Sequence, residues 1–179
     1  MATLIPLAQV DPAMIEQLLD RAFGPDRHAR TAYRIREGAD WLEALSFAAL
    51  DEDDMLVGTI QCWPVSLVTP DGKPHPMVMV GPVAVLPEHQ EQGFGKALMA
   101  ASLGAIDAGF EQGAPPLPQV MIGDAPYYGR WGFNADHTSG WHCPGPFDPS
   151  RLLVRTNNPA ILPAEGMLGP WPPVLASDD

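Results

Sequence analysis

The residues best suited to chemistry in this sequence form a glycine turn, Gln90-Glu91-Gln92-Gly93-Phe94-Gly95-Lys96, between two apolar stretches. This order predicts a buried strand that runs through a short turn directly into a helix. Such a turn directs backbone N–H groups into one small space at the positive end of the helix. Glycines at 93 and 95 would let a bound group approach the backbone closely. The chemistry that fits is the binding of a phosphate or pyrophosphate.

Other phosphate-binding motifs fit this turn less well. A Walker-type loop requires Ser or Thr after its lysine, whereas Lys96 is followed by Ala97. A dinucleotide fingerprint requires Gly or Ala three residues after the second glycine, where this chain has Leu98. A tight turn that binds no ligand is the remaining alternative.

A second element with reactive side chains lies downstream, in residues 123–133. It contains a tyrosine pair, Tyr127 and Tyr128, and ends in Gly132-Phe133. A tyrosine hydroxyl can donate a proton to a departing anion. The alternative is that both tyrosines pack in the core, with only the hydroxyl hydrogen-bonded.

Together the two elements resemble those of the GNAT superfamily of acyl-CoA-dependent N-acyltransferases. Gln90-x-x-Gly93-x-Gly95 resembles its Gln/Arg-x-x-Gly-x-Gly/Ala motif, and Tyr128-x-x-x-Gly132-Phe133 resembles its Tyr-x-x-x-Gly-Phe element. The resemblance extends over about residues 5–133 and implies a small, bacterial-type member. We therefore expect a single domain of residues 1–179, in which the proline-rich part 144–179 packs on the motif-bearing core.

The resemblance also implies an α/β fold. Its central sheet would be mixed and mostly antiparallel, splayed between two central strands, with helices on both faces. Pro82 fits this expectation, because a proline within a strand cannot donate to the ladder and forces a bulge or a parting from a neighbour. In the family the pantetheine arm of coenzyme A (CoA) lies in that opening. Val83, Ala84 and Val85 would then line it, with backbone groups of Val83 and Val85 as its partners. A plain edge strand is the alternative.

The activity that the resemblance implies is transfer of an acetyl group from acetyl-CoA to a primary amine by direct attack. Tyr128, which matches the family tyrosine near the CoA sulfur, would protonate the departing thiolate, with Tyr127 in reserve. A strand N–H near Val83 would stabilise the oxyanion. The pyrophosphate would be bound by Gln90, Glu91, Gln92, Gly93, Phe94, Gly95 and Lys96.

The group that takes the proton from the amine is not evident. Many relatives use a glutamate on the strand before the glycine turn, but residues 77–86 contain no carboxylate. His75 is a candidate base, acting directly or through water, and deprotonation by solvent is the alternative. Glu88 and His89 are expected to face solvent.

A zinc site and a non-catalytic role are the main alternatives to this activity. His137, His142 and Cys143 lack a fourth ligand in a suitable spacing, so we expect no metal. The missing strand carboxylate favours an alternative function, a non-catalytic acyl-CoA-binding sensor or regulatory module. A flavin- or nicotinamide-binding module that uses the same turn is a third possibility.

The composition limits the partners. A net charge of −12 argues against nucleic acid and against an anionic membrane surface, and it is compatible with a cationic amine on a small molecule or peptide. The sequence has no signal-peptide pattern and no bilayer-spanning stretch. Its two cysteines indicate reduced thiols and a cytoplasmic location, without a disulfide. A homodimer is left open.

The elements that must position these residues follow from periodicity and turn residues. Asp11 is expected to cap a helix that extends to about residue 23, with Met14, Ile15, Leu18, Leu19 and Ala22 as its apolar stripe. The helix after the glycine turn, 93–110, is apolar around most of its circumference. Its stripes would be Phe94, Ala97, Leu98, Ala101 and Ala105, and then Met99, Ile106 and Phe110, with Lys96, Asp107 and Glu111 exposed and residues 113–116 ending it.

The remaining elements alternate strands with turns. Strands are expected at 3–7, 46–50, 56–68, 77–86, 119–123 and 152–155, with another beginning at Phe133. Helices are expected at 27–37 and, for one turn, at 125–128. The acidic run 51–54 reads as a hairpin turn rather than a metal site, and residues 69–73 form a second turn. The tail 157–179 is expected to wrap the surface.

Overall fold

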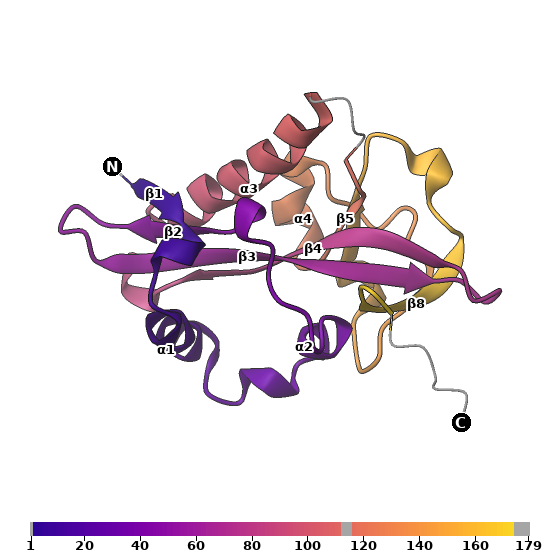
Figure 1. The fold of residues 1–179 in the computed structure, drawn as a ribbon, viewed down its shortest axis with the longest axis horizontal. Helices are drawn as coiled ribbons and strands as arrows, with labels where there is room; N and C mark the ends of the chain where they lie inside the picture. The colour runs from indigo at the N-terminus through magenta and orange to yellow at the C-terminus, as the bar shows by residue number, and fades with distance from the viewer. Residues whose placement is uncertain (1, 112–115, 174–179) are drawn as a thin grey trace. The chain divides into compact units, whose positions relative to one another are not determined.

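A computed structural model describes residues 2–111 and 116–173 of the chain. It is an α/β fold with one eight-stranded sheet and flanking helices (Figure 1). The strands are β1 (Thr3–Pro6), β2 (Phe47–Leu50), β3 (Leu56–Val68), β4 (Pro74–Val85), β5 (Gln119–Ile122), β6 (Gly140–His142), β7 (Leu152–Arg155) and β8 (Glu165–Pro170). The helices are α1 (Pro12–Phe23), α2 (Thr31–Ile35), α3 (Phe94–Glu111) and α4 (Ala125–Tyr128), with several one-turn 3-10 helices between them.

The sheet is mixed and mostly antiparallel, as predicted. Its order is β1-β2-β3-β4-β5-β7, and β8 pairs with both β3 and β6. The β1–β2, β2–β3, β3–β8 and β5–β7 pairings are antiparallel, whereas β4–β5 and β6–β8 are parallel. The parallel register of β4 and β5 runs through Val78–Gln119 and Met79–Val120, before Pro82 is reached. A parting of the strands at Pro82 itself stays a prediction.

The chain divides into two compact units. The first contains Met1–Ala29, Trp41–Cys62 and Val80–Pro116, and the second contains Arg30–Asp40, Trp63–Met79 and Leu117–Asp179. Strands β3 and β4 are each divided between the two units, so that one part of each strand belongs to the first unit and the other part to the second. The glycine turn belongs to the first unit and the tyrosine pair to the second.

In the first unit, α1 and α3 lie on opposite faces of the sheet (Figure 1). Asp11 caps α1 as predicted, because its Oδ1 accepts a hydrogen bond from the N–H of Ala13 at 2.9 Å. The face of α1 that packs on the sheet contributes Ile15, Leu18 and Leu19 to a core with Ala84 and Leu86. Met14 was expected in this stripe but is 46% exposed, because it lies at the edge of the stripe in the first helical turn.

Helix α3 begins at Phe94 and buries Leu98 and Met99, as its apolar pattern predicts, while Lys96 and Asp107 are exposed. The Ser102 hydroxyl donates a hydrogen bond to the Leu45 carbonyl at 2.7 Å and fixes the helix to the segment before β2. The side chains of Phe110 and Glu111, and residues 113–115 of the predicted helix end, lie outside the described part of the chain.

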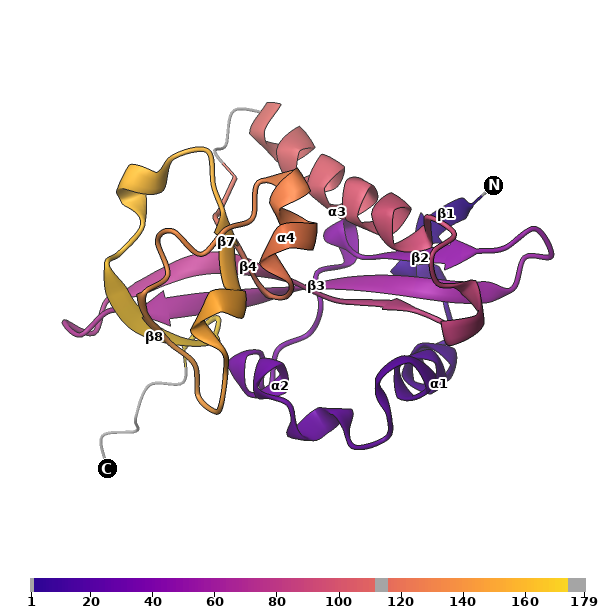
Figure 2. The ribbon, with the colours of Figure 1, turned by 180° about the vertical axis from the view of Figure 1, so that it is seen from behind.

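In the second unit, α2 and α4 lie on opposite faces of the sheet, which Figure 2 shows from behind. The predicted turn 69–73 joins β3 to β4, with Gly72 at a φ of 83°. The core of this unit centres on Trp141, which is buried with Leu67, Met77, Leu152 and other residues from β3, β4, β5, β7 and β8.

Three sequence expectations for the fold were wrong. Residues 27–37 do not form one helix, because Arg27 turns inward to pair with Glu16 and, at 3.0 Å, with Asp20 of α1, and α2 begins only at Thr31. No strand begins at Phe133, since only an isolated bridge joins Asn134 to Val154.

The third correction concerns the C-terminal segment. Part of the predicted surface tail forms β8, which pairs with β3 from Val65–Pro170 to Val68–Met167. Leu168 on this strand is only 1% exposed. The short β6 was also not predicted. β8 is rich in residues of low strand propensity (Glu165, Gly166, Gly169 and Pro170), and pairing with neighbouring strands overrides that propensity.

Candidate functional site

The glycine turn has the backbone geometry of an anion site. Glu91 and Gly93 both have positive φ values, 65° and 88°. The N–H of Ala97 donates to the Gly93 carbonyl at 3.0 Å and makes the first hydrogen bond of α3. The N–H groups of Phe94 and Gly95, in the first helical turn, therefore have no intrahelical acceptor and can receive an anion.

Gly93 is required by this geometry rather than by packing. A Cβ atom built on Gly93 would meet nothing within 4 Å, so the space beside it is open. The positive φ, however, strains any residue with a side chain. The turn thus presents an accessible backbone at the end of a helix, which a phosphate can approach.

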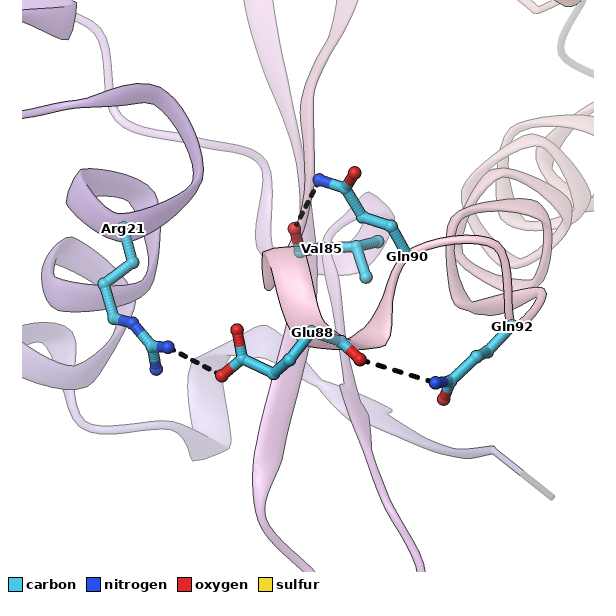
Figure 3. Close-up of polar contacts among 5 residues, drawn as sticks. All are labelled: Arg21, Val85, Glu88, Gln90 and Gln92. Atoms are coloured by element: carbon cyan, nitrogen blue, oxygen red, sulfur yellow. Dashed lines mark hydrogen bonds and ion pairs between the residues drawn. The ribbon is translucent and has the colours of Figure 1, made fainter.

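Polar contacts hold the turn in place (Figure 3). The Gln90 Nε2 donates to the Val85 carbonyl at 3.4 Å, and the Gln92 Nε2 donates to the Glu88 carbonyl at 3.5 Å. Arg21 of α1 pairs with the Glu88 carboxylate at 2.6 Å. The backbone N–H of Glu88 and the Arg21 guanidinium hold the pKa of this carboxyl below its usual range, so Glu88 stays ionised and suits anchoring rather than proton transfer.

The strand before the turn presents the backbone expected to meet the pantetheine arm. Ala84 is buried toward α1, while Val83 and Val85 are half-buried. The Val85 carbonyl already accepts the long bond from Gln90, so a ligand would use its second lone pair or displace that amide. Gly58 of β3 lies against this stretch, because a Cβ there would come within 3.0 Å of the Ala84 carbonyl oxygen. The sequence analysis missed Gly58, although a lone glycine within an apolar strand signals such a close approach.

His89 is more enclosed than predicted. Its ring meets Phe94 edge-on, with the centroids 5.9 Å apart, and its Nδ1 is buried without a hydrogen-bond partner among the described residues. His89 also lines a cavity of about 320 Å³ together with residues of the glycine turn and of the acidic hairpin turn. The complete lining is Ala2, Asp51, Glu52, Asp53, His89, Gln92 and Phe94.

The tyrosine pair is built on a turn that only glycine allows. A Cβ on Gly123 would lie 2.6 Å from Cε2 of Tyr128, so this ring packs directly on the glycine backbone. The N–H groups of Tyr127 and Tyr128 both donate to the Asp124 carbonyl, at 3.1 and 2.9 Å, and form the single turn of α4. The two rings meet edge-on at 4.9 Å.

The hydroxyl of Tyr128 is protonated at neutral pH. Its side chain is half-buried, and desolvation raises the pKa of Tyr128 above its ordinary value of 10.0. The Arg151 charge opposes this rise and the Asp124 charge adds to it. A protonated, partly desolvated hydroxyl is suited to giving a proton to a stronger base.

His75 and Tyr128 lie at opposite ends of the β4–β5 strand pair. His75 lies near the amino end of β4, three residues before the first pair of the parallel β4–β5 register, whereas Tyr128 follows the carboxyl end of β5. Parallel strands keep these ends at opposite edges of the sheet within this unit. A role for His75 as base therefore stays a prediction without support from this placement.

The cysteines and the remaining histidines do not assemble into a reactive site. Burial raises the pKa of the Cys62 thiol to about 12 and that of Cys143 to about 11, so both are poor nucleophiles. Within residues 2–111 and 116–173, no group of three or more His, Cys, Asp or Glu side chains is placed to hold a metal ion. None of the helices that the structure describes has the length and apolar character needed to cross a membrane.

The chain is related in sequence to a family of transferases. A family model described as an acetyltransferase (GNAT) domain matches residues 6–135, which include both the glycine turn and the tyrosine pair. The chain therefore belongs to the GNAT acetyltransferase family, as the two motifs predicted. No curated protein matches the chain.

Solved structures share the fold. A GNAT family N-acetyltransferase from Escherichia coli (YhbS), in complex with CoA, is 24% identical with a TM-score of 0.67, over 93% of this chain and 87% of that one. A GNAT family acetyltransferase from Brucella melitensis, in complex with acetyl-CoA, is 25% identical with a TM-score of 0.60, over 93% of each chain. The similarity to both proteins extends beyond the region that the family model matches.

Proposed function

We propose that this chain transfers an acetyl group from acetyl-CoA to the primary amine of a small molecule or peptide. The observation that carries the proposal is the glycine turn, with Gly93 at positive φ and open space beside it, at the first turn of α3 in a GNAT chain. The two similar structures in complex with CoA and with acetyl-CoA support the choice of cosubstrate.

The cosubstrate is bound by backbone more than by side chains in this proposal. Residues 90–96 hold the pyrophosphate through N–H groups at the helix end, and Lys96 adds the one positive side chain of this turn. Backbone groups of Val83 and Val85 meet the pantetheine amides, with Ala84 between them. The Gln90 amide, which now donates to the Val85 carbonyl, shares or yields that acceptor when the cosubstrate binds.

The reaction is direct attack by the amine nitrogen on the thioester carbonyl carbon. As the C–N bond forms and the C–S bond breaks, the departing sulfur takes the proton of the Tyr128 hydroxyl. The new amide loses one proton from nitrogen to solvent, and the Tyr128 oxygen takes a proton back from solvent. The developing oxyanion is stabilised by a strand N–H near Val83. Holding the two reactants in line supplies much of the rate enhancement.

A non-catalytic acyl-CoA-binding module is the second candidate. The observation that favours it is the absence of Asp and Glu from β4, Pro74–Val85, so that this strand offers no carboxylate to accept the amine proton. The two candidates differ in chemistry, because a binder releases no thiol from acetyl-CoA at any amine concentration.

Thermal unfolding with acetyl-CoA, CoA, ATP or NAD tests the binding site first. A ligand at about a hundred times its Kd stabilises the native state by about 2.7 kcal/mol, which shifts the unfolding midpoint. We expect a shift with acetyl-CoA and CoA alone. If neither produces a shift, the glycine turn binds no CoA and the proposed function fails.

Thiol release from acetyl-CoA with a panel of primary amines then separates the two candidates. Release that depends on an amine supports the transferase. Stabilisation by acetyl-CoA without release for any amine of the panel favours the regulatory module.

A further inference from the structure

Two polar side chains of β3 are buried in the first unit. Thr59 is 0% and Gln61 is 3% exposed. The Oγ1 of Thr59 and the Oε1 of Gln61 have no hydrogen-bond partner among the residues that the structure describes. Burying a polar atom without a partner is unfavourable, so these two unpaired atoms require a partner that the described side chains do not supply.

Both side chains point to the face of the sheet that α1 covers. Gly58 faces α3, because a Cβ built on it would lie 3.1 Å from the Leu98 side chain, and successive residues of a strand point to opposite faces. The register agrees, since Thr59 pairs with Ala48, which belongs to the apolar core under α1. The two unpaired atoms therefore lie on the same face, two residues apart, within an apolar core.

The polar pair lies beside residues 82–84 of β4. The N–H of Leu86 donates to the Val57 carbonyl at 2.9 Å. The turn 69–73 joins β3 to β4, so the two strands run antiparallel and each step forward along β3 is a step back along β4. Residues 82–84 contain the stretch in which the proposed function places the N–H that stabilises the oxyanion.

One water molecule between Thr59 and Gln61 satisfies both unpaired atoms. An amide oxygen accepts hydrogen bonds, whereas a hydroxyl can both donate and accept. Positions two residues apart on a strand are separated by roughly 6.6 Å, a span that a water bridges with two hydrogen bonds. A buried water makes about three hydrogen bonds, so one is left for a group beside β4.

The attacking amine of the proposed function is such a group. Its nitrogen becomes positively charged as the C–N bond forms, and β4 has no carboxylate to face that charge. A water that donates to the Gln61 Oε1 keeps a lone pair with which it accepts a hydrogen bond from the amine N–H. This hydrogen bond strengthens as the nitrogen becomes charged, so it stabilises the transition state more than the ground state.

We propose that Thr59 and Gln61 hold an internal water that orients the attacking amine and stabilises the positive charge developing on its nitrogen. The two are positioning residues, since they act on the amine through the water. The proposal rests on the proposed function, to which it adds residues of β3 that neither family motif contains.

Thiol release with the diamine cadaverine, together with calorimetric titration of acetyl-CoA, tests this role. Thr59→Val keeps the shape of the side chain without its hydroxyl, and Gln61→Met keeps its length without the amide oxygen. Each should lower kcat about tenfold or more, while the KM for cadaverine and the Kd for acetyl-CoA change less than about twofold. The double variant should lose no more than the weaker single variant, because both residues hold the same water. Thr59→Ser should keep most of the activity.

Ser102→Ala is the matched control, because it removes another fully buried hydroxyl of the first unit, on the α3 side of the sheet, and should keep kcat. The Kd for acetyl-CoA reports folding in every variant, and Thr59→Val alone decides the test if Gln61→Met does not fold. A wild-type kcat in Thr59→Val overturns the proposal, as does an equal loss of kcat in Ser102→Ala.

A high-resolution crystal structure gives a second test that does not depend on activity. It should show a water within hydrogen-bond distance of both Thr59 Oγ1 and Gln61 Oε1. If no water lies there, the proposal is wrong and the proposed function stands. A wild type that releases no thiol with cadaverine or any other amine of the panel contradicts the proposed function itself.

Discussion

At the scale of single residues, the proposed chemistry depends most on Tyr128. Replacing it with phenylalanine keeps the ring against Gly123 but removes the hydroxyl proton. We expect Tyr128→Phe to lower kcat about a hundredfold or more, as for loss of a general acid, and to change the Kd for CoA less than twofold. Thiol release and calorimetry measure the two quantities. Tyr127→Phe is the control and should keep most of the activity; equal losses from both substitutions would show that packing, not proton transfer, is affected.

The same residue predicts how activity depends on pH. Since desolvation raises the pKa of Tyr128 above its ordinary value, the hydroxyl stays protonated from neutral to mildly alkaline pH, where the fraction of unprotonated amine grows. The rate should therefore rise with pH and decline only above about pH 10. A decline that sets in near neutral pH would assign the acid to another group.

Gly93 is the residue on which the anion site depends. A carboxylate at this position would face the bound phosphate. The electrostatic repulsion between two like charges about 4 Å apart is expected to raise the Kd for CoA about a hundredfold or more. Gly93→Asp should therefore abolish the thermal shift caused by CoA. Gly104→Asp places the same charge on an exposed part of α3, where a Cβ meets nothing within 4 Å, and should keep the shift. Unchanged CoA affinity in a folded Gly93→Asp protein would disprove the site.

At the scale of elements, β8 was not predicted from the sequence, although its Leu168 is buried in the core of the second unit. Successive side chains of β8 differ in solvent exposure, since Leu168 is 1% exposed and the neighbouring Met167 is 45% exposed. Leu168→Ala should reduce the free energy of unfolding by about 2–5 kcal/mol, because it opens a cavity between β8 and the Trp141 core. Met167→Ala should change it by no more than about 0.5 kcal/mol. Urea unfolding compares the two, and equal effects would contradict the register of β8 with β3.

At the scale of the whole molecule, the net charge of −12 favours a cationic acceptor. Cadaverine and n-pentylamine offer the same reacting amine, but cadaverine carries a second ammonium group. We expect a higher kcat/KM for cadaverine, and an advantage that shrinks as ionic strength rises from about 50 to about 500 mM, because salt screens the attraction. Equal kcat/KM values at low salt would show that the charge serves solubility alone.

Much of the site could be predicted because its signals are local in the chain. The spacing of Gln90, Gly93 and Gly95 after an apolar strand indicates a tight turn into a helix, and Asp11 with Pro12 indicates a helix start; the structure has both elements. Phosphate binding by the turn stays a prediction. The family model confirmed the membership that the two motifs predicted. The assignment of individual residues to pyrophosphate, pantetheine and proton transfer stays a proposal.

What could not be predicted depends on pairing between distant segments. Glycine and proline lower the strand propensity of Glu165–Pro170, and only its pairing with β3 makes it a strand. Arg27 looked like a residue of a charged helix, yet it is buried because Asp20 and Glu16 of α1 compensate its charge. Neither outcome is encoded in the neighbouring residues.

The sequence by itself determined the class of this protein, because both family motifs consist of particular residues at fixed, closely spaced positions, where backbone angles and helix ends are set locally. Only the tertiary structure brought the Arg151 carbonyl to the N–H of Gly123, and placed His75 and Tyr128 at opposite ends of a parallel strand pair. Such placements are decided by strand register and burial, which are established by residues far apart in the chain.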